Sequence, residues 1–116
     1  MNKVTIYHNP RCSKSRQTLS LLEEQGVTPN VIEYLKTPPS VEKLGEILTL
    51  LELSPRELMR KKEAPYAELN LADASMSEAE LINAMVNNPV LIERPIVLAN
   101  GKAAIGRPPE NVLALL

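Results

Sequence analysis

The chain has 116 residues, 44% of them hydrophobic, and thirteen basic residues against fourteen acidic ones give a net charge of -1. This balance of charges provides no electrostatic field that would attract nucleic acid or an anionic membrane. Trp and Phe are absent, so few aromatic side chains are available on which nucleic-acid bases could stack. No apolar run approaches the roughly 18 residues of a membrane helix, and the N-terminus lacks the apolar block of a signal peptide. A single cysteine fits a reducing compartment. We therefore expect one domain, residues 1–116, in the cytoplasm, with neither nucleic acid nor a membrane as partner.

The first third of the chain predicts a strand, a helix and a second strand. Residues 3–7 form a short β-pattern, and the Asn9-Pro10 pair that follows is a turn signal. Leucines recur at helical spacing over residues 13–25, and Gly26 supplies the C-terminal stop. Residues 30–34 predict the second strand, which should run parallel to the first because a helix connects the two.

The middle of the chain, from about residue 40 to 88, predicts a block of helices. Ser40 can cap a helix with a stripe of apolar residues. Two capping boxes follow, one at Ser54 and one at Ser77, each with a glutamate three residues later. The helix after Ser54 is expected to include residues 56–62 and therefore to carry Arg60.

The last quarter of the chain predicts a hairpin and a closing helix. Residues 96–98 and 102–105 are two strands joined by Asn100-Gly101, the commonest two-residue hairpin turn, and Pro108-Pro109 precedes the helix. The resulting order of elements is that of an α/β, thioredoxin-like domain. Its mixed four-stranded sheet should be flanked by helices, with the helical block as an enlarged insert.

The only cysteine, Cys12, is the strongest candidate for chemistry, because it lies between an expected strand and an expected helix. The start of a helix carries partial positive charge, and Arg11, Lys14 and Arg16 add cationic neighbours that favour the thiolate. Burial as a small hydrophobe is the commoner fate of a free cysteine, but the polar neighbours argue against it here. We therefore predict that Cys12 is a catalytic nucleophile.

The residues around Cys12 limit the class of thiol chemistry. His8 could tune or protonate the thiolate, or could only hold the loop in place. A metal site is not expected, since one His and one Cys cannot supply four ligands. Ser15 occupies the position of the second thiol of a dithiol motif, so any resolving thiol must come from another molecule, and Thr18 stands where a cysteine phosphatase loop has its arginine. The Cys-x-x-Ser spacing of monothiol glutaredoxins is matched.

Three arginines lie at expected loops or element ends, where binding groups concentrate: Arg60, Arg94 and Arg107. The alternative for each is a solvated surface charge, which is the usual fate of an arginine. Pro95 opens a strand directly after Arg94, and this is where thioredoxin-like folds carry a cis peptide bond.

From end to end, the chain resembles the glutaredoxin-coupled arsenate reductases, the ArsC-like branch of the thioredoxin superfamily. The family's active-site pattern is matched by His8, Cys12 and Arg16. Further matching segments follow in order: Tyr34-Leu35, Thr37-Pro38-Pro39, Leu58-Met59-Arg60-Lys61, Pro65-Tyr66, Leu91-Ile92, Arg94-Pro95-Ile96-Val97 and Arg107-Pro108.

The resemblance implies a reaction and its residues. The Cys12 thiolate would attack the arsenic of arsenate, Arg60, Arg94 and Arg107 would gather around the oxyanion, and Ser15 would lie beside the thiol. No cofactor would be bound: glutathione would serve as external reductant, and glutaredoxin would recycle the mixed disulfide as arsenite is released. Guanidinium groups match tetrahedral oxyanions bidentately, so the assignment is chemically sound.

The chain departs from the family pattern beside the nucleophile. Ser13-Lys14 replaces a Gly-Thr pair, and Lys14 and Arg11 add charge at the mouth of the site. These changes could alter the oxyanion selectivity or mark a housekeeping relative with weak arsenate turnover. Two alternatives stay open: monothiol glutaredoxin-like disulfide exchange, and a noncatalytic regulatory binding module of the same superfamily.

Overall fold

The structure is a computed structural model that describes residues 3–116, and the chain divides into two compact units. The first unit is the chain up to Thr37 together with Arg94–Leu116, and the second is Pro38–Glu93, which corresponds to the expected helical insert. In the part of the chain that the structure describes, no helix combines the length and the apolar character needed to span a membrane.

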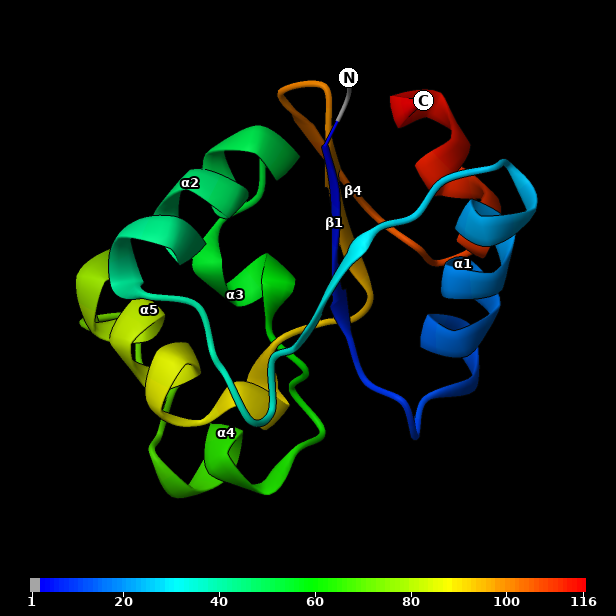
Figure 1. The fold of residues 1–116 in the computed structure, drawn as a ribbon. Coiled ribbons are helices and arrows are strands. Elements are labelled where there is room, and N and C mark those ends of the chain that lie inside the picture. Colours follow the sequence, from blue (N-terminus) through cyan, green and yellow to red (C-terminus); the bar gives the residue numbers. More distant parts are fainter. Residues whose placement is uncertain (1–2) are drawn as a thin grey trace. The chain divides into compact units, whose positions relative to one another are not determined.

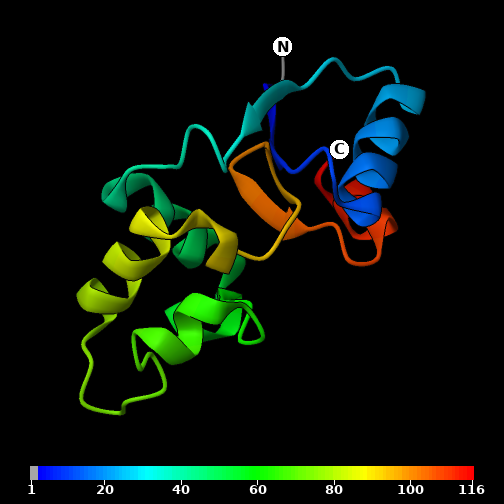
Figure 2. The same ribbon diagram turned by 90° about the horizontal axis from the view of Figure 1, so that it is seen from below.

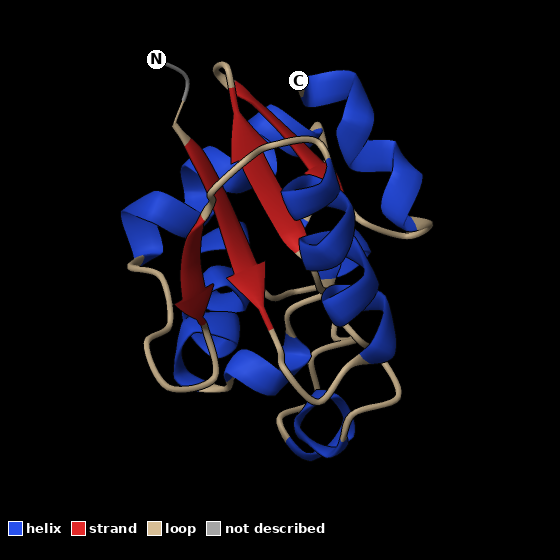
Figure 3. Ribbon diagram, turned by 45° about the vertical axis from the view of Figure 1, so that its right-hand side comes forward, coloured by secondary structure: helices blue, strands red, loops and turns tan. Residues whose placement is uncertain are grey.

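The first unit contains the sheet, which has the thioredoxin-like arrangement (Figures 1 and 3). Its strands are β1 (Val4–His8), β2 (Asn30–Glu33), β3 (Ile96–Ala99) and β4 (Lys102–Ile105), in the order β2-β1-β3-β4. The β1–β2 pair is parallel, and the β1–β3 and β3–β4 pairs are antiparallel. Asn100 and Gly101 both have positive φ, of 54° and 72°, as the predicted hairpin turn requires. The mixed four-stranded α/β fold predicted from the sequence is confirmed.

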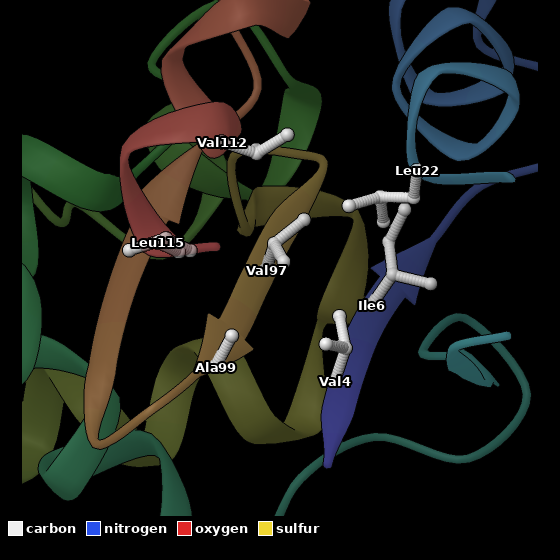
Figure 4. Packing of buried hydrophobic residues seen from close by; sticks show 7 residues of the cluster. All are labelled: Val4, Ile6, Leu22, Val97, Ala99, Val112 and Leu115. Atoms are coloured by element: carbon white, nitrogen blue, oxygen red, sulfur yellow. The ribbon is translucent and has the colours of Figure 1, made fainter. Parts of the chain in front are cut away.

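Two helices cover one face of this sheet. Helix α1 (Ser13–Glu24) and the 3₁₀ helix η2 (Pro109–Leu115) pack against each other, as Figures 1 and 2 show. The strand register places Val4 opposite Ala99 and Ile6 opposite Val97, so all four side chains share the covered face. With Leu22, Val112 and Leu115 they form the buried core of the unit (Figure 4).

The second unit consists mainly of helices. It contains α2 (Val41–Leu51), α3 (Pro55–Leu58), α4 (Ala64–Glu68), α5 (Glu78–Asn87) and the 3₁₀ helix η1 (Pro89–Leu91), with α5 packed against α2, α3 and η1. Ser40 caps α2 by accepting a hydrogen bond from the backbone N–H of Lys43, and both predicted capping boxes are formed, at Ser54 and Ser77. The N-termini of α2, α3 and α5 are therefore fixed by the local sequence, as predicted.

The helix expected over residues 56–62 is shorter than predicted, because α3 ends at Leu58. Met59 is extended and forms an isolated antiparallel bridge with Ile92, and the backbone N–H of Arg60 donates to the carbonyl of Leu91 at 2.7 Å. A partner distant in sequence thus takes the backbone groups that would have continued the helix. The prediction that Arg60 lies on a helix was wrong.

Candidate active site

The pairing of the strands brings four chain segments to one end of the sheet in the first unit. The last residues of β1, Tyr7 and His8, pair with the start of β3 at Ile96 and the end of β2 at Glu33, and Ile96 in turn pairs with the end of β4 at Ile105. The loop before Cys12, Arg94 before β3 and Arg107 after β4 therefore converge at this end, which Figure 3 shows at the tip of β1.

Cys12 is the N-cap of α1. It has an extended backbone, with φ −93° and ψ 124°, and its side chain is half-buried. A tight turn fixes it, because the N–H of Cys12 donates to the carbonyl of Asn9 at 3.0 Å while its own carbonyl accepts from the N–H of Arg16 at 3.0 Å. The sulfur thus lies where the first N–H groups of the helix have no partner within the helix.

The environment lowers the pKa of Cys12. Burial acts to raise this pKa, but it is outweighed by the backbone N–H of Ser15, by the hydrogen bond and positive charge of the Arg94 guanidinium, and by the backbone N–H of Lys14. The thiolate is the form that attacks electrophiles, so the site favours an activated nucleophile. The reactive role predicted for Cys12 agrees with this electrostatic environment.

Two arginines approach the sulfur from the β3–β4 side of the sheet. Arg94 donates a side-chain hydrogen bond to Cys12, and Nη2 of Arg107 lies 3.5 Å from its Sγ. The two are linked, since Nε of Arg107 donates to the carbonyl of Arg94 at 2.8 Å. Both Arg94 and Arg107 precede prolines across cis peptide bonds, including the one predicted at Arg94-Pro95.

A buried hydrogen-bond network supports the loop on the other side. The hydroxyl of Ser15 accepts from the backbone N–H of Asn9 at 3.0 Å and lies 2.6 Å from Nδ1 of His8. Burial lowers the pKa of His8, the charge of Glu33 opposes this, and that of Arg16 adds to it. A neutral ring can accept the proton of the Ser15 hydroxyl, so His8 holds the residue whose N–H faces the sulfur.

Two further arginines near the loop, Arg16 and Arg11, make different contacts. Nη1 of Arg16 donates to the carbonyl of Pro10 at 2.9 Å and so braces the turn from the helix side. The N–H of Arg11 donates to the side-chain oxygen of Asn9 at 3.0 Å, and the Arg11 side chain is exposed. Arg16 therefore stabilises the geometry of the loop that carries Cys12.

A close contact behind the site, at Gly106, was not predicted from the sequence. Gly106 is buried, and a Cβ placed on it would be only 2.8 Å from Cγ of Pro95 and 3.0 Å from Cγ2 of Thr18. The Thr18 hydroxyl donates to the carbonyl of Lys14 at 2.8 Å. In the sequence, the position of Gly106 directly between a predicted strand and Arg107 was a sign that the backbone approaches another segment closely there.

Arg60 belongs to the second unit. Its Nε lies 3.3 Å from a carboxylate oxygen of Glu63 and its Nη1 lies 3.1 Å from one of Glu93, in ion pairs that leave the Arg60 side chain 24% exposed. Its role as a third oxyanion ligand, which the family resemblance implies, stays a prediction. Among residues 3–116, no cluster of His, Cys, Asp and Glu side chains could hold a metal ion.

Comparisons with known proteins agree with this geometry. The chain is 51% identical to an arsenate reductase of Neisseria meningitidis over the full length of both chains, and 63% identical to the uncharacterized protein YfgD of Escherichia coli over 98% of this chain and 97% of that protein. The structure of an arsenate reductase from Vibrio cholerae, 56% identical, superposes with a TM-score of 0.95 over 98% of each chain. The ArsC family pattern matches residues 7–115, and the chain therefore belongs to the ArsC family.

Proposed function

We propose that this protein is an arsenate reductase that acts through a thiolate on Cys12, with glutathione as reductant and glutaredoxin as recycling partner. The observation that carries the proposal is the pair of guanidinium groups, Arg94 and Arg107, placed at the sulfur of a cysteine with a lowered pKa. Guanidinium groups bind tetrahedral oxyanions bidentately, so an arsenate held by them would have its arsenic next to the nucleophile.

In the first step, the Cys12 thiolate attacks the arsenic of arsenate. An S–As bond forms and an As–O bond breaks, as a hydroxyl group of arsenate takes up one proton from the solvent and leaves as water. Negative charge grows on the other oxygens as the bond forms, and Arg94 and Arg107 stabilise it. The N–H groups of Lys14 and Ser15 hold the sulfur as an anion until it reacts.

In the second step, the thiolate of glutathione attacks the sulfur of Cys12. The S–As bond breaks, its electron pair stays on arsenic, and arsenite leaves as the product of a two-electron reduction. Cys12 is left in a disulfide with glutathione, which a thiol of glutaredoxin attacks to regenerate the enzyme. An external thiol is required because the chain contains a single cysteine.

The test is turnover of arsenate in a mixture with glutathione, glutaredoxin, glutathione reductase and NADPH. Cys12→Ser should abolish arsenate-dependent NADPH oxidation. Arg94→Ala and Arg107→Ala should each reduce kcat/KM by about 10²–10³-fold, the usual effect of removing one oxyanion donor. Lys102→Ala, at the exposed first residue of β4, is the matched control and should leave the turnover unchanged. Undiminished turnover in Cys12→Ser would contradict the proposal.

Monothiol disulfide exchange is the second candidate, because the Cys12-x-x-Ser15 spacing is accompanied by a hydrogen bond from the Ser15 N–H to the sulfur. This function predicts rapid deglutathionylation of a model peptide without arsenate. It also predicts that Arg107→Ala has little effect, since no oxyanion is bound. A slow reaction that arsenate accelerates would favour the reductase.

A further inference from the structure

A pocket opens beside the active-site loop, on the side of β1 away from Arg94 and Arg107. Its volume is about 310 Å³, at the lower end of the range of small-molecule sites. It lies within the first unit, and its lining comes from the turn before Cys12 and from the end of β2: His8, Asn9, Pro10, Arg11, Glu33, Leu35 and Lys36.

The order of the strands shows where this pocket lies relative to the Cys12 loop and the two arginines. The sheet order β2-β1-β3-β4 places the Cys12 loop, at the end of β1, between the pocket on the β2 side and the two arginines on the β3–β4 side. An oxyanion held by Arg94 and Arg107 would therefore leave the β2 side of the loop open.

The chemistry of the second step needs an approach from that side. A thiolate that displaces a group from sulfur attacks opposite to the bond that breaks, so it must arrive from the side facing away from arsenic. With arsenic on the β3–β4 side, the attacking thiol comes from the β2 side, where the pocket lies. The pocket adjoins the turn directly before Cys12, on the other side of the loop from the two arginines that would hold the oxyanion.

The charges that line the pocket match one small thiol. Arg11 and Lys36 provide two cations and Glu33 provides one carboxylate, 3.6 Å from Nζ of Lys36. Glutathione carries two carboxylates and one ammonium group, the complementary set. Lys36 is 80% exposed and Arg11 is exposed, so both side chains are free to turn toward a ligand, and the exposed Leu35 offers an apolar surface.

We propose that this pocket binds the glutathione whose thiol attacks Cys12, with Arg11 and Lys36 on its carboxylates and Glu33 on its ammonium group. The proposal rests on the proposed function, because it assigns a place to the reductant of that reaction. It gives a role to Arg11, one of the charges by which this chain departs from the family pattern.

The test isolates the attack on Cys12 from arsenate chemistry. Full-length protein is prepared with Cys12 in a mixed disulfide with thionitrobenzoate, and the release of the coloured thiolate is followed with glutathione or with uncharged 2-mercaptoethanol. In this step glutathione forms a disulfide with Cys12 and thionitrobenzoate leaves with the electron pair. The wild type should prefer glutathione, and the dimethyl ester of glutathione should lose the preference.

The double variant Arg11→Gln/Lys36→Gln should reduce the rate with glutathione by roughly three- to twentyfold, as expected for two exposed ion pairs, and leave the rate with 2-mercaptoethanol unchanged. Lys102→Gln removes an exposed charge at the start of β4 and should change neither rate. Equal changes in the rates with both thiols, or no change in the rate with glutathione, would overturn the assignment of the pocket to glutathione.

Arsenate turnover by the wild type is measured in parallel. If the wild type reduces arsenate and the double variant still prefers glutathione over 2-mercaptoethanol, the glutathione pocket is refuted and the arsenate function is not. If the wild type does not reduce arsenate and the double variant loses its preference for glutathione, the arsenate function is refuted and the pocket is not.

Discussion

Gly106 is a position where one added methyl group tests the packing behind the active site. In Gly106→Ala the new Cβ would lie 2.8 Å from Cγ of Pro95 and 3.0 Å from Cγ2 of Thr18, whereas carbon atoms in contact are about 3.5–4.0 Å apart. The strand end and α1 must therefore separate by several tenths of an ångström. Overpacking of this kind costs about 1–3 kcal/mol, so the melting temperature should fall by roughly 4–12 °C.

The same displacement should reach Cys12. Pro95 directly follows Arg94, whose guanidinium lowers the pKa of Cys12, and Gly106 directly precedes Arg107. Moving this segment away from α1 weakens both contacts, so the pKa of Cys12 should rise toward its usual value in Gly106→Ala. Thermal unfolding followed by circular dichroism measures the first effect, and the rate of iodoacetamide alkylation against pH measures the second.

Two controls make this prediction refutable. Gly45→Ala places a Cβ where no atom lies within 4 Å, so it should stabilise the helical unit by about 0.5–1 kcal/mol. Thr18→Ala removes Oγ1 and Cγ2 of Thr18, which are two of the three atoms nearest to the added Cβ. Its cost and that of Gly106→Ala should therefore not add in the double variant. Wild-type stability and an unchanged alkylation profile in Gly106→Ala, or strict additivity with Thr18→Ala, would show that Gly106 is not tightly packed against α1.

Three further predictions concern the charged groups. Alkylation of Cys12 should have a midpoint below that of the free thiol of an unstructured peptide in the same buffer, and Arg94→Ala should move the midpoint upward; a wild-type midpoint at or above that of the peptide would contradict this. Burial lowers the pKa of His8, so the unfolded chain binds its proton at a higher pH than the folded chain does. The free energy of unfolding should therefore fall as the pH drops from above about 6.5 through the folded pKa, and urea titrations should show a weaker dependence in His8→Asn. Arg60→Ala should cost less than about 2 kcal/mol, because its two ion pairs are partly exposed. A large rise in its arsenate KM would then be evidence for the predicted oxyanion role.

Local patterns in the sequence were enough to predict most of the fold. The Asn100-Gly101 turn, the two Ser-x-x-Glu capping boxes and the β-patterns each depend on interactions within a few residues, so they can be identified without tertiary information. Cys12 could be recognised for the same reason, since its position at the start of a helix is itself a local property.

Contacts between distant residues could not be predicted in this way. The helix expected to carry Arg60 ends early because the backbone there bonds to Leu91, and the chain before Leu91 gives no sign of the pairing. The contact of Gly106 with Thr18 joins residues 88 positions apart.

Most of the elements, and Cys12 as the candidate nucleophile, could be predicted from the sequence, because helix caps, turns and a lone thiol at a helix start are local features. The approach of Arg94 and Arg107 to the sulfur from one side of β1, and the charged pocket on the other side, became visible only in the folded chain. The physical reason is that strand order and register, which set these distances, depend on the burial of apolar faces across the whole unit and not on any one segment.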